Sequence, residues 1–139
     1  MRPGEDGAGR RLRYPRGMRT PWFSIGSTLL AVAVAAGALG AHLLRTRLDA
    51  SSMGLWETAV RYLTLGGFAL IAAGLGSHAA PDRPWRTAGT ALTAGATIFS
   101  GTVAALALGG PRWLGAVTPL GGLLLIAGLV AMAAAAARR

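Results

Sequence analysis

Few side chains of this 139-residue chain could carry acid–base or metal chemistry. His42 and His78 are its two histidines, and it has no cysteine, which excludes disulfides, thiolate metal sites and cysteine-based catalysis. His42 follows an apolar stretch, where a neutral imidazole can titrate near neutral pH or bind a metal. Catalysis by His42 would need a second ionisable group, for which Asp49 and Glu57 are the candidates. We favour the simpler interpretation that His42 is a polar cap at a helix end.

Other arrangements that support catalysis are absent from the sequence. We find no nucleophile beside a base, no paired carboxylates and no phosphate-binding loop between a strand and a helix. We therefore expect that the protein is not an enzyme and that it has no catalytic residue, metal site, cofactor or small-molecule ligand.

Hydroxyl groups are the other polar side chains within the apolar stretches. Thr97, Ser100 and Thr102 lie in one stretch and Thr118 lies in the next. In a small transporter or channel these hydroxyls would line a shared polar path, with Pro119 as the hinge. In a structural bundle each would instead donate to a carbonyl one turn back on its own helix. No Asp, Glu, Lys or Arg lies within the stretches, which argues against a proton-coupled exporter.

Apolar segments must position these side chains. The chain is 53% hydrophobic and 14% charged, outside the usual balance of soluble proteins. A transmembrane helix needs about 20 apolar residues, because that length matches a hydrocarbon core of about 30 Å. Four segments qualify, at about residues 22–44, 62–80, 87–110 and 113–137. The sequence therefore predicts an all-α integral membrane protein with four transmembrane helices in a compact bundle.

Residues 1–21 are rich in arginine, glycine and proline. They lack apolar periodicity, and we expect a disordered cytoplasmic tail, followed by a membrane domain over residues 22–139. Met18 is an alternative start of the chain. A cleavable signal peptide is the competing interpretation of Arg10, Arg11 and the apolar stretch behind them. That stretch spans about 20 residues, however, whereas the apolar part of a signal peptide spans about 7 to 15.

The arginines predict an orientation. The net charge is +9 and all 14 basic residues are arginine; they gather in the tail and at the ends of the apolar segments, which favours the lipid bilayer over nucleic acid as the partner. With the N-terminus inside, ten arginines are cytoplasmic and three (Arg45, Arg47 and Arg112) are not, while Arg61 is ambiguous. The positive-inside rule then predicts an inner-membrane protein with both termini in the cytoplasm.

The segment between the first two apolar stretches is expected at the membrane surface. Asp49, Ser51 and Ser52 can cap a helix that begins there. Glu57 precedes Arg61 by four residues, the favourable order for a helical ion pair. Tryptophans lie at or just before the start of each apolar segment, where an indole prefers the headgroup level. They are Trp22, Trp56, Trp85 and Trp113.

Small residues four positions apart would let helices approach closely in lipid. They are Ala33 with Gly37, Ala36 with Gly40, Ala91 with Gly95, Thr97 with Gly101, and Thr118 with Gly122. Self-association into a homo-oligomer through such faces is a further expectation. Pro119 cannot donate to the carbonyl of Gly115, and we expect a bend there unless a side chain such as Thr118 satisfies that carbonyl.

Four sequence blocks resemble one known family. They are Gly37-Ala38-Leu39-Gly40-Ala41-His42, Thr58-Ala59-Val60-Arg61-Tyr62, Phe99-Ser100-Gly101, and Leu114-Gly115-Ala116-Val117-Thr118-Pro119-Leu120-Gly121-Gly122. In this order and spacing they resemble the bacterial inner-membrane family known as domain of unknown function 423, related to eukaryotic transmembrane protein 256. The resemblance covers about residues 22–135.

The resemblance implies a four-helix membrane protein of unassigned activity. It also implies that His42, Thr58, Ser100, Thr118 and Pro119 matter for function or structure. Leu63 and Gly66 stand where relatives tend to carry glutamine and histidine, which argues against a histidine-based site shared with them. We expect a structural or accessory four-helix bundle, and the alternative is a small transporter or channel.

Overall fold

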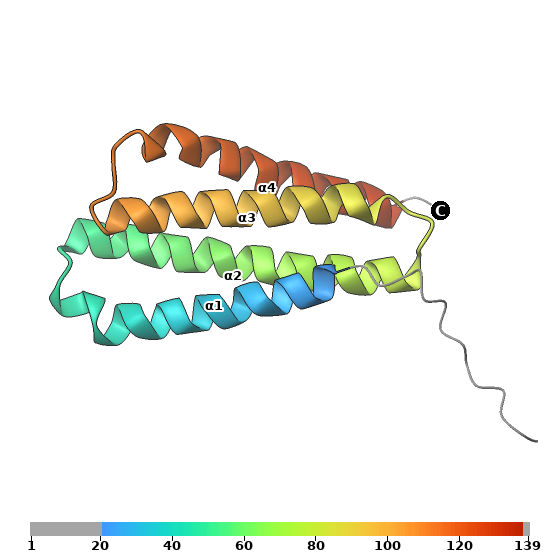
Figure 1. Cartoon of the computed structure of the whole chain (residues 1–139). Coiled ribbons are helices and arrows are strands. Elements are labelled where there is room, and N and C mark those ends of the chain that lie inside the picture. Colours follow the sequence, from blue (N-terminus) through green and yellow to red (C-terminus); the bar gives the residue numbers. More distant parts are fainter. Residues whose placement is uncertain (1–20, 138–139) are drawn as a thin grey trace, which may run out of the picture.

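The computed structural model describes residues 21–137, and its long elements are four α-helices (Figure 1). They are α1 (Trp22–His42), α2 (Ala50–Ala79), α3 (Trp85–Ala107) and α4 (Leu114–Ala137), with a short 3-10 helix η1 (Leu44–Thr46) after α1. All four are long and apolar enough to cross a membrane, which confirms the predicted all-α membrane fold. The predicted tail lies, apart from Pro21, outside the described residues.

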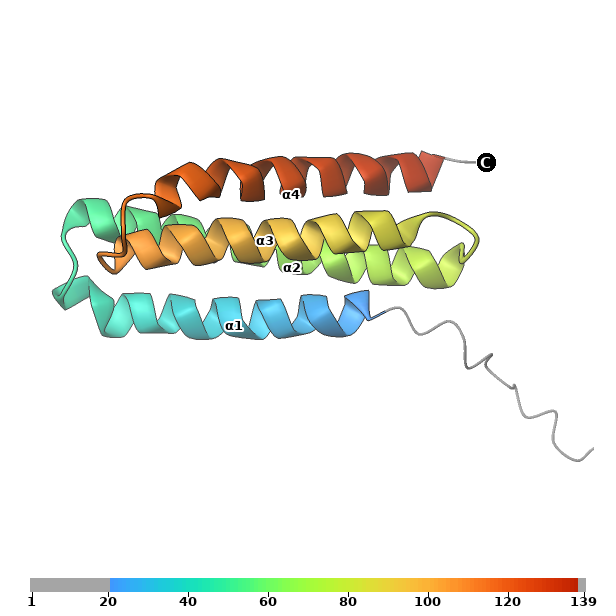
Figure 2. The same cartoon turned by 45° about the horizontal axis from the view of Figure 1, so that its top comes forward.

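The helices run up and down in chain order, each packed against the next (Figure 1). α1 and α4 lie on opposite sides of the α2–α3 pair (Figure 2). The start of α1 and the end of α4 lie at one end of the bundle, together with the α2–α3 connection. We call this the Trp22 end. The opposite end, which carries the α1–α2 and α3–α4 connections, is called the His42 end.

α2 begins at Ala50, well before the window predicted to start at Tyr62. Its 30 residues make a helix about 45 Å long, which exceeds the hydrocarbon thickness by several turns. The extra turns carry charged residues that an apolar window omits. Asp49 caps this helix as predicted, because its Oδ1 accepts a hydrogen bond from the Ser52 amide at 2.7 Å. The other helices match their windows within a few residues.

Glycine lets neighbouring backbones touch. A Cβ on Gly26 would lie 2.6 Å from the Gly67 carbonyl oxygen across α1–α2, and a Cβ on Gly95 would lie 2.5 Å from the Leu125 amide nitrogen across α3–α4. Contacts this close exclude any side chain. Gly74, Gly121 and Gly128 meet the backbone of Phe23, Phe99 and Leu92 in the same way.

The predicted small-residue pairs are correct only in part. Gly95 lies at a helix contact and Gly40 lies against Trp56, whereas a Cβ on Gly101 would meet nothing within 4 Å and one on Gly37 would make only an ordinary contact with Val60. Gly122 likewise has ordinary room beside Phe99.

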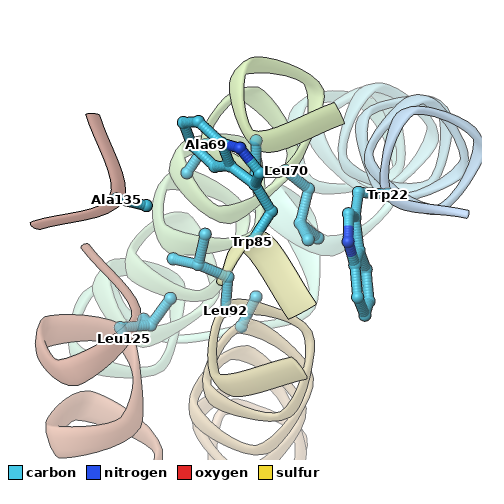
Figure 3. Packing of buried hydrophobic residues seen from close by; sticks show 9 residues of the cluster. Trp22, Ala69, Leu70, Trp85, Leu92, Leu125 and Ala135 are labelled. Atoms are coloured by element: carbon cyan, nitrogen blue, oxygen red, sulfur yellow. The ribbon is translucent and has the colours of Figure 1, made fainter. Parts of the chain in front are cut away.

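Three of the four tryptophans pack in the protein interior, and their location at the headgroup level stays a prediction. Trp22, Trp56 and Trp85 are buried, while Trp113 is 64% exposed. The indole of Trp85 donates to the Ala80 carbonyl at 2.9 Å. Side chains from all four helices meet at the Trp22 end in one apolar cluster (Figure 3). It includes Trp22, Ala69, Leu70, Trp85, Leu92, Leu125 and Ala135.

Arg83, in the α2–α3 connection, reaches the end of α4. Its Nη1 donates to the carbonyl of Ala135 at 3.1 Å and to that of Ala136 at 2.9 Å. These carbonyls belong to the last turn of α4, which has no amides of its own to pair with them. The arginine charge also lies at the negative end of the helix dipole. Arg83 therefore ties the end of α4 to the α2–α3 connection.

Replacing Gly95 by alanine should separate α3 from α4. The new Cβ would meet the backbone of Leu124 and Leu125, and overpacking of this kind typically costs about 1 to 3 kcal/mol. The free energy of unfolding in detergent micelles measures the change. Gly101→Ala on the same helix is the matched control and should not lower it, because a Cβ there meets nothing within 4 Å and alanine favours the helix over glycine. Equal stability of both variants would contradict the glycine contact.

Candidate functional site

Trp56 divides the space between α1, α2 and α3 at the His42 end. Its Nε1 donates to the Ala36 carbonyl of α1 at 3.0 Å. The ring fits here only because residue 40 is a glycine: a Cβ on Gly40 would lie 2.7 Å from the Trp56 Nε1. Trp56 packs with Leu44 and Ala107 in a second apolar cluster. The Trp56 indole thus links α2 to α1 by a hydrogen bond and by packing.

A charged groove of about 620 Å³ lies on one side of Trp56, between α1 and the start of α2. Gly37, Gly40 and Val60 form the apolar floor of this groove. Arg45, Glu57 and Arg61 also line it. In the described part of the chain these three charged side chains make no hydrogen bond or ion pair with another residue. The ion pair predicted between Glu57 and Arg61 is therefore not formed.

A second, apolar groove of about 310 Å³ lies between α1, α2 and α3, and Trp56 lines it as well. Leu29, Val32 and Leu63 contribute to its walls, and Thr97 and Ser100 line it from α3. Ser100 is only 4% exposed. Among the described residues, its hydroxyl and the indole N–H of Trp22 are the buried side-chain polar groups without a hydrogen-bond partner.

Most other helix hydroxyls are satisfied locally. Thr58 donates to the Gly54 carbonyl at 2.8 Å, Thr97 to that of Thr93 at 2.8 Å and Thr118 to that of Leu114 at 2.9 Å. Thr102 lies within 2.8 Å of the Ile98 carbonyl and 2.9 Å from the Thr118 hydroxyl. The Thr102–Thr118 contact joins α3 to α4, away from the groove that Ser100 lines. The four hydroxyls therefore do not all share one cavity, because Thr97 and Ser100 line the apolar groove whereas Thr102 and Thr118 do not.

The five sequence-predicted positions do not form one site. His42 is exposed and lines neither groove. Thr58 and His42 both belong to the His42 end, Ser100 lines the apolar groove, and Thr118 and Pro119 lie on α4. Thr118 bonds to Leu114 and not to the Gly115 carbonyl that Pro119 leaves unpaired. His78 lies near the end of α2, at the Trp22 end, so the two histidines are well separated.

Metal ligands do not assemble in the part of the chain that the structure describes, where no group of three His, Asp or Glu side chains could hold an ion. Asp49 is occupied as the α2 cap. The amide of Ser52, then its side chain, hold the pKa of Asp49 below the ordinary 3.8, with a smaller contribution from the Ser51 amide.

Sequence reasoning missed Trp56 as the centre of the site and missed the charged groove. The available signal was the predicted pairing of Ala36 with Gly40, just before His42, which marks a place of close approach. Arg45 was counted only for topology, and Glu57 was considered as a helical ion pair with Arg61 or as a partner of His42, but the three were not expected to meet in one groove. Their convergence follows from the antiparallel crossing of α1 and α2, which the sequence alone does not display.

Comparison with known proteins agrees with the four-block resemblance. A family model described as protein of unknown function (DUF423) matches residues 36–122. A UPF0382 membrane protein of Staphylococcus haemolyticus is 42% identical over 105 residues, 75% of this chain and 84% of that protein. The UPF0382 membrane protein YwdK of Bacillus subtilis is 31% identical over 115 residues, 82% of this chain and 94% of that protein. No solved structure matches the chain.

These relatives are named as membrane proteins and their names state no activity. Together with four helices able to span a bilayer, they identify a multi-pass membrane protein.

Removing the Asp49 cap should fray the first turn of α2 in a pH-dependent manner. Because the folded pKa is below 3.8, the carboxylate stabilises the turn fully above that value and loses this effect as the pH falls through the folded pKa. At pH 7, Asp49→Ala should therefore speed amide hydrogen exchange at Ser52 and Met53, and the difference from the parent should vanish at low pH.

Asp49→Asn is the control for this prediction. The amide oxygen of asparagine still accepts a hydrogen bond but does not titrate. Exchange at Ser52 should therefore stay slow in that variant, with no pH-dependent loss of protection beyond intrinsic exchange. Identical amide exchange at Ser52 in the parent and both variants across the pH range would contradict the assignment of Asp49 as the helix cap.

Proposed function

The chain belongs to the family of proteins of unknown function DUF423, and we propose on that premise that its role in the membrane is structural or accessory, without enzymatic activity of its own. The observation that carries the proposal is how the helix hydroxyls are used. Thr97, Thr102 and Thr118 bond to carbonyls of their own helices. Such hydroxyls are already satisfied and offer no continuous polar path for a solute.

The proposal places the protein in the inner membrane with both termini in the cytoplasm. The start of α1 and the end of α4 share one end of the bundle (Figure 1). On the sequence count, that side holds ten arginines: six before residue 21, Arg83, Arg86, Arg138 and Arg139. Arg61 belongs to the first turns of α2, which brings the opposite side to four. The asymmetry supports a cytoplasmic Trp22 end.

The lipid bilayer is the partner that this role requires. Self-association of the chain is a further part of the proposal. Gly101 and Gly115 face open space, and small residues left uncovered on lipid-facing helices allow a second helix to approach closely.

A small transporter remains the second candidate because of Ser100. Its buried hydroxyl lacks a partner and lines a groove of about 310 Å³. Leaving a buried donor unsatisfied costs about 1 to 3 kcal/mol, and a passing polar solute would supply the missing partner. The apolar walls of the groove favour the structural role over this alternative.

Single cysteines test the orientation, since the chain has no native cysteine. Ser51 and Asp82 are exposed, and they lie at opposite ends of the bundle. In intact cells a membrane-impermeant maleimide should label Ser51→Cys, whereas Asp82→Cys should react only after the membrane is permeabilised. The reverse pattern would overturn the proposed orientation.

Cysteines inside the bundle separate the structural role from transport. A thiol reacts with maleimide only as a hydrated thiolate, so Thr97→Cys, Ser100→Cys and Thr102→Cys should remain unlabelled in a dry bundle. Labelling of Ser100→Cys by a small charged reagent, at a rate within about tenfold of Ser51→Cys, would show that water reaches the groove. That result would overturn the structural role and favour a small transporter.

A further inference from the structure

We propose that the charged groove beside Trp56 binds a phospholipid whose headgroup carries both a phosphate and a primary ammonium, as in phosphatidylethanolamine. Arg45 and Arg61 hold the phosphate, Glu57 holds the ammonium, and the start of an acyl chain lies on the groove floor. The site thus selects a membrane lipid, which goes beyond a structural role in the bilayer.

The charges in the groove match such a headgroup. Two arginines and one glutamate line it, and none of the three is paired within the described chain. A guanidinium group binds phosphate oxygens through two parallel N–H donors. A carboxylate accepts hydrogen bonds from a primary ammonium, but a quaternary ammonium has no N–H to donate. Glu57 also disfavours lipids that bring only negative charge.

The groove lies at the depth of lipid headgroups. α2 is about 45 Å long against a hydrocarbon core of about 30 Å, and Glu57 and Arg61 belong to its first four turns. Arg45 lies in η1, directly after α1 ends. Arginine side chains near helix ends extend toward the membrane surface. The three charged groups can therefore reach the phosphate level while their stems remain beside lipid.

The groove floor suits a hydrocarbon chain. Gly37 and Gly40 present no side chain there, and Val60 and Met53 add apolar surface. A Cβ on Gly37 would make only an ordinary contact with Val60 Cγ1, at 3.7 Å, so the two helices are not tightly packed at this turn. The volume of about 620 Å³ falls within the range of about 300 to 1,000 Å³ for small-molecule sites. It accommodates a headgroup together with the first part of one acyl chain.

Native mass spectrometry of the full chain in detergent micelles tests the proposal. The protein is titrated with phosphatidylethanolamine, phosphatidylcholine and phosphatidylglycerol of identical acyl chains. The first lipid should bind about fivefold more tightly than either of the others, the upper range expected for a partly exposed ion pair. Equal binding of phosphatidylethanolamine and phosphatidylcholine would overturn the proposal, and so would a preference for phosphatidylglycerol.

Variants assign the roles of the charged residues. Arg45→Gln and Arg61→Gln should weaken binding of all three lipids, because each carries a phosphate. Glu57→Gln should remove the preference for phosphatidylethanolamine over phosphatidylcholine and strengthen phosphatidylglycerol binding. Arg112→Gln, an exposed arginine in the α3–α4 connection, is the matched control and should bind as the parent does. Parent-like lipid preference in Glu57→Gln would refute the ammonium contact.

Free phosphoethanolamine distinguishes a lipid site from a headgroup site. A soluble headgroup lacks the acyl chain that lies on the floor, so it should fail to displace the bound lipid at concentrations about a hundredfold higher. Displacement at equal concentration would mean that the groove recognises a soluble phosphate compound, and the lipid assignment would be wrong. Circular dichroism of every variant confirms that the helices are retained.

Discussion

In a lipid bilayer a helix gains little by hiding its leucines, so the bundle depends on how closely its backbones can approach. Glycine provides that approach at Gly26 and Gly67 between α1 and α2, and at Gly95 and Gly121 between α3 and α4. Dispersion contacts and weak C–H···O interactions across such surfaces replace the hydrophobic force that holds soluble bundles together. Where the ring of Trp56 stands between helices, direct backbone contact gives way to two grooves.

The sequence was sufficient for the number of spans and for the capping of α2 by Asp49, because both follow from local rules of length, hydropathy and hydrogen bonding, but it missed the first turns of α2, which carry charged residues. It was insufficient to predict which face of each helix packs against a neighbour. Gly37 and Gly40 are equally small, yet only Gly40 meets a ring, since Trp56 crosses α1 at that turn. In a chain with 21 glycines, many small-residue pairs satisfy the pattern, and the crossing points of the helices decide which of them are used.

The same limit applies to the polar residues. Thr97 and Ser100 are three residues apart on α3 and line the same groove, but the threonine hydroxyl bonds to its own helix and the serine hydroxyl does not. The candidate functional site is thus the surroundings of Trp56, and not the scattered positions that the family resemblance indicates. There a charged groove and an apolar groove share one indole as their common wall.

Arg83 gives the fold an order of assembly. Its two acceptors lie 52 and 53 residues further along the chain, so during synthesis α1, α2 and α3 emerge from the ribosome before the partner of Arg83 exists. Only when the end of α4 arrives does the guanidinium gain its two peptide carbonyls, so this contact fastens the bundle as the last step of its assembly.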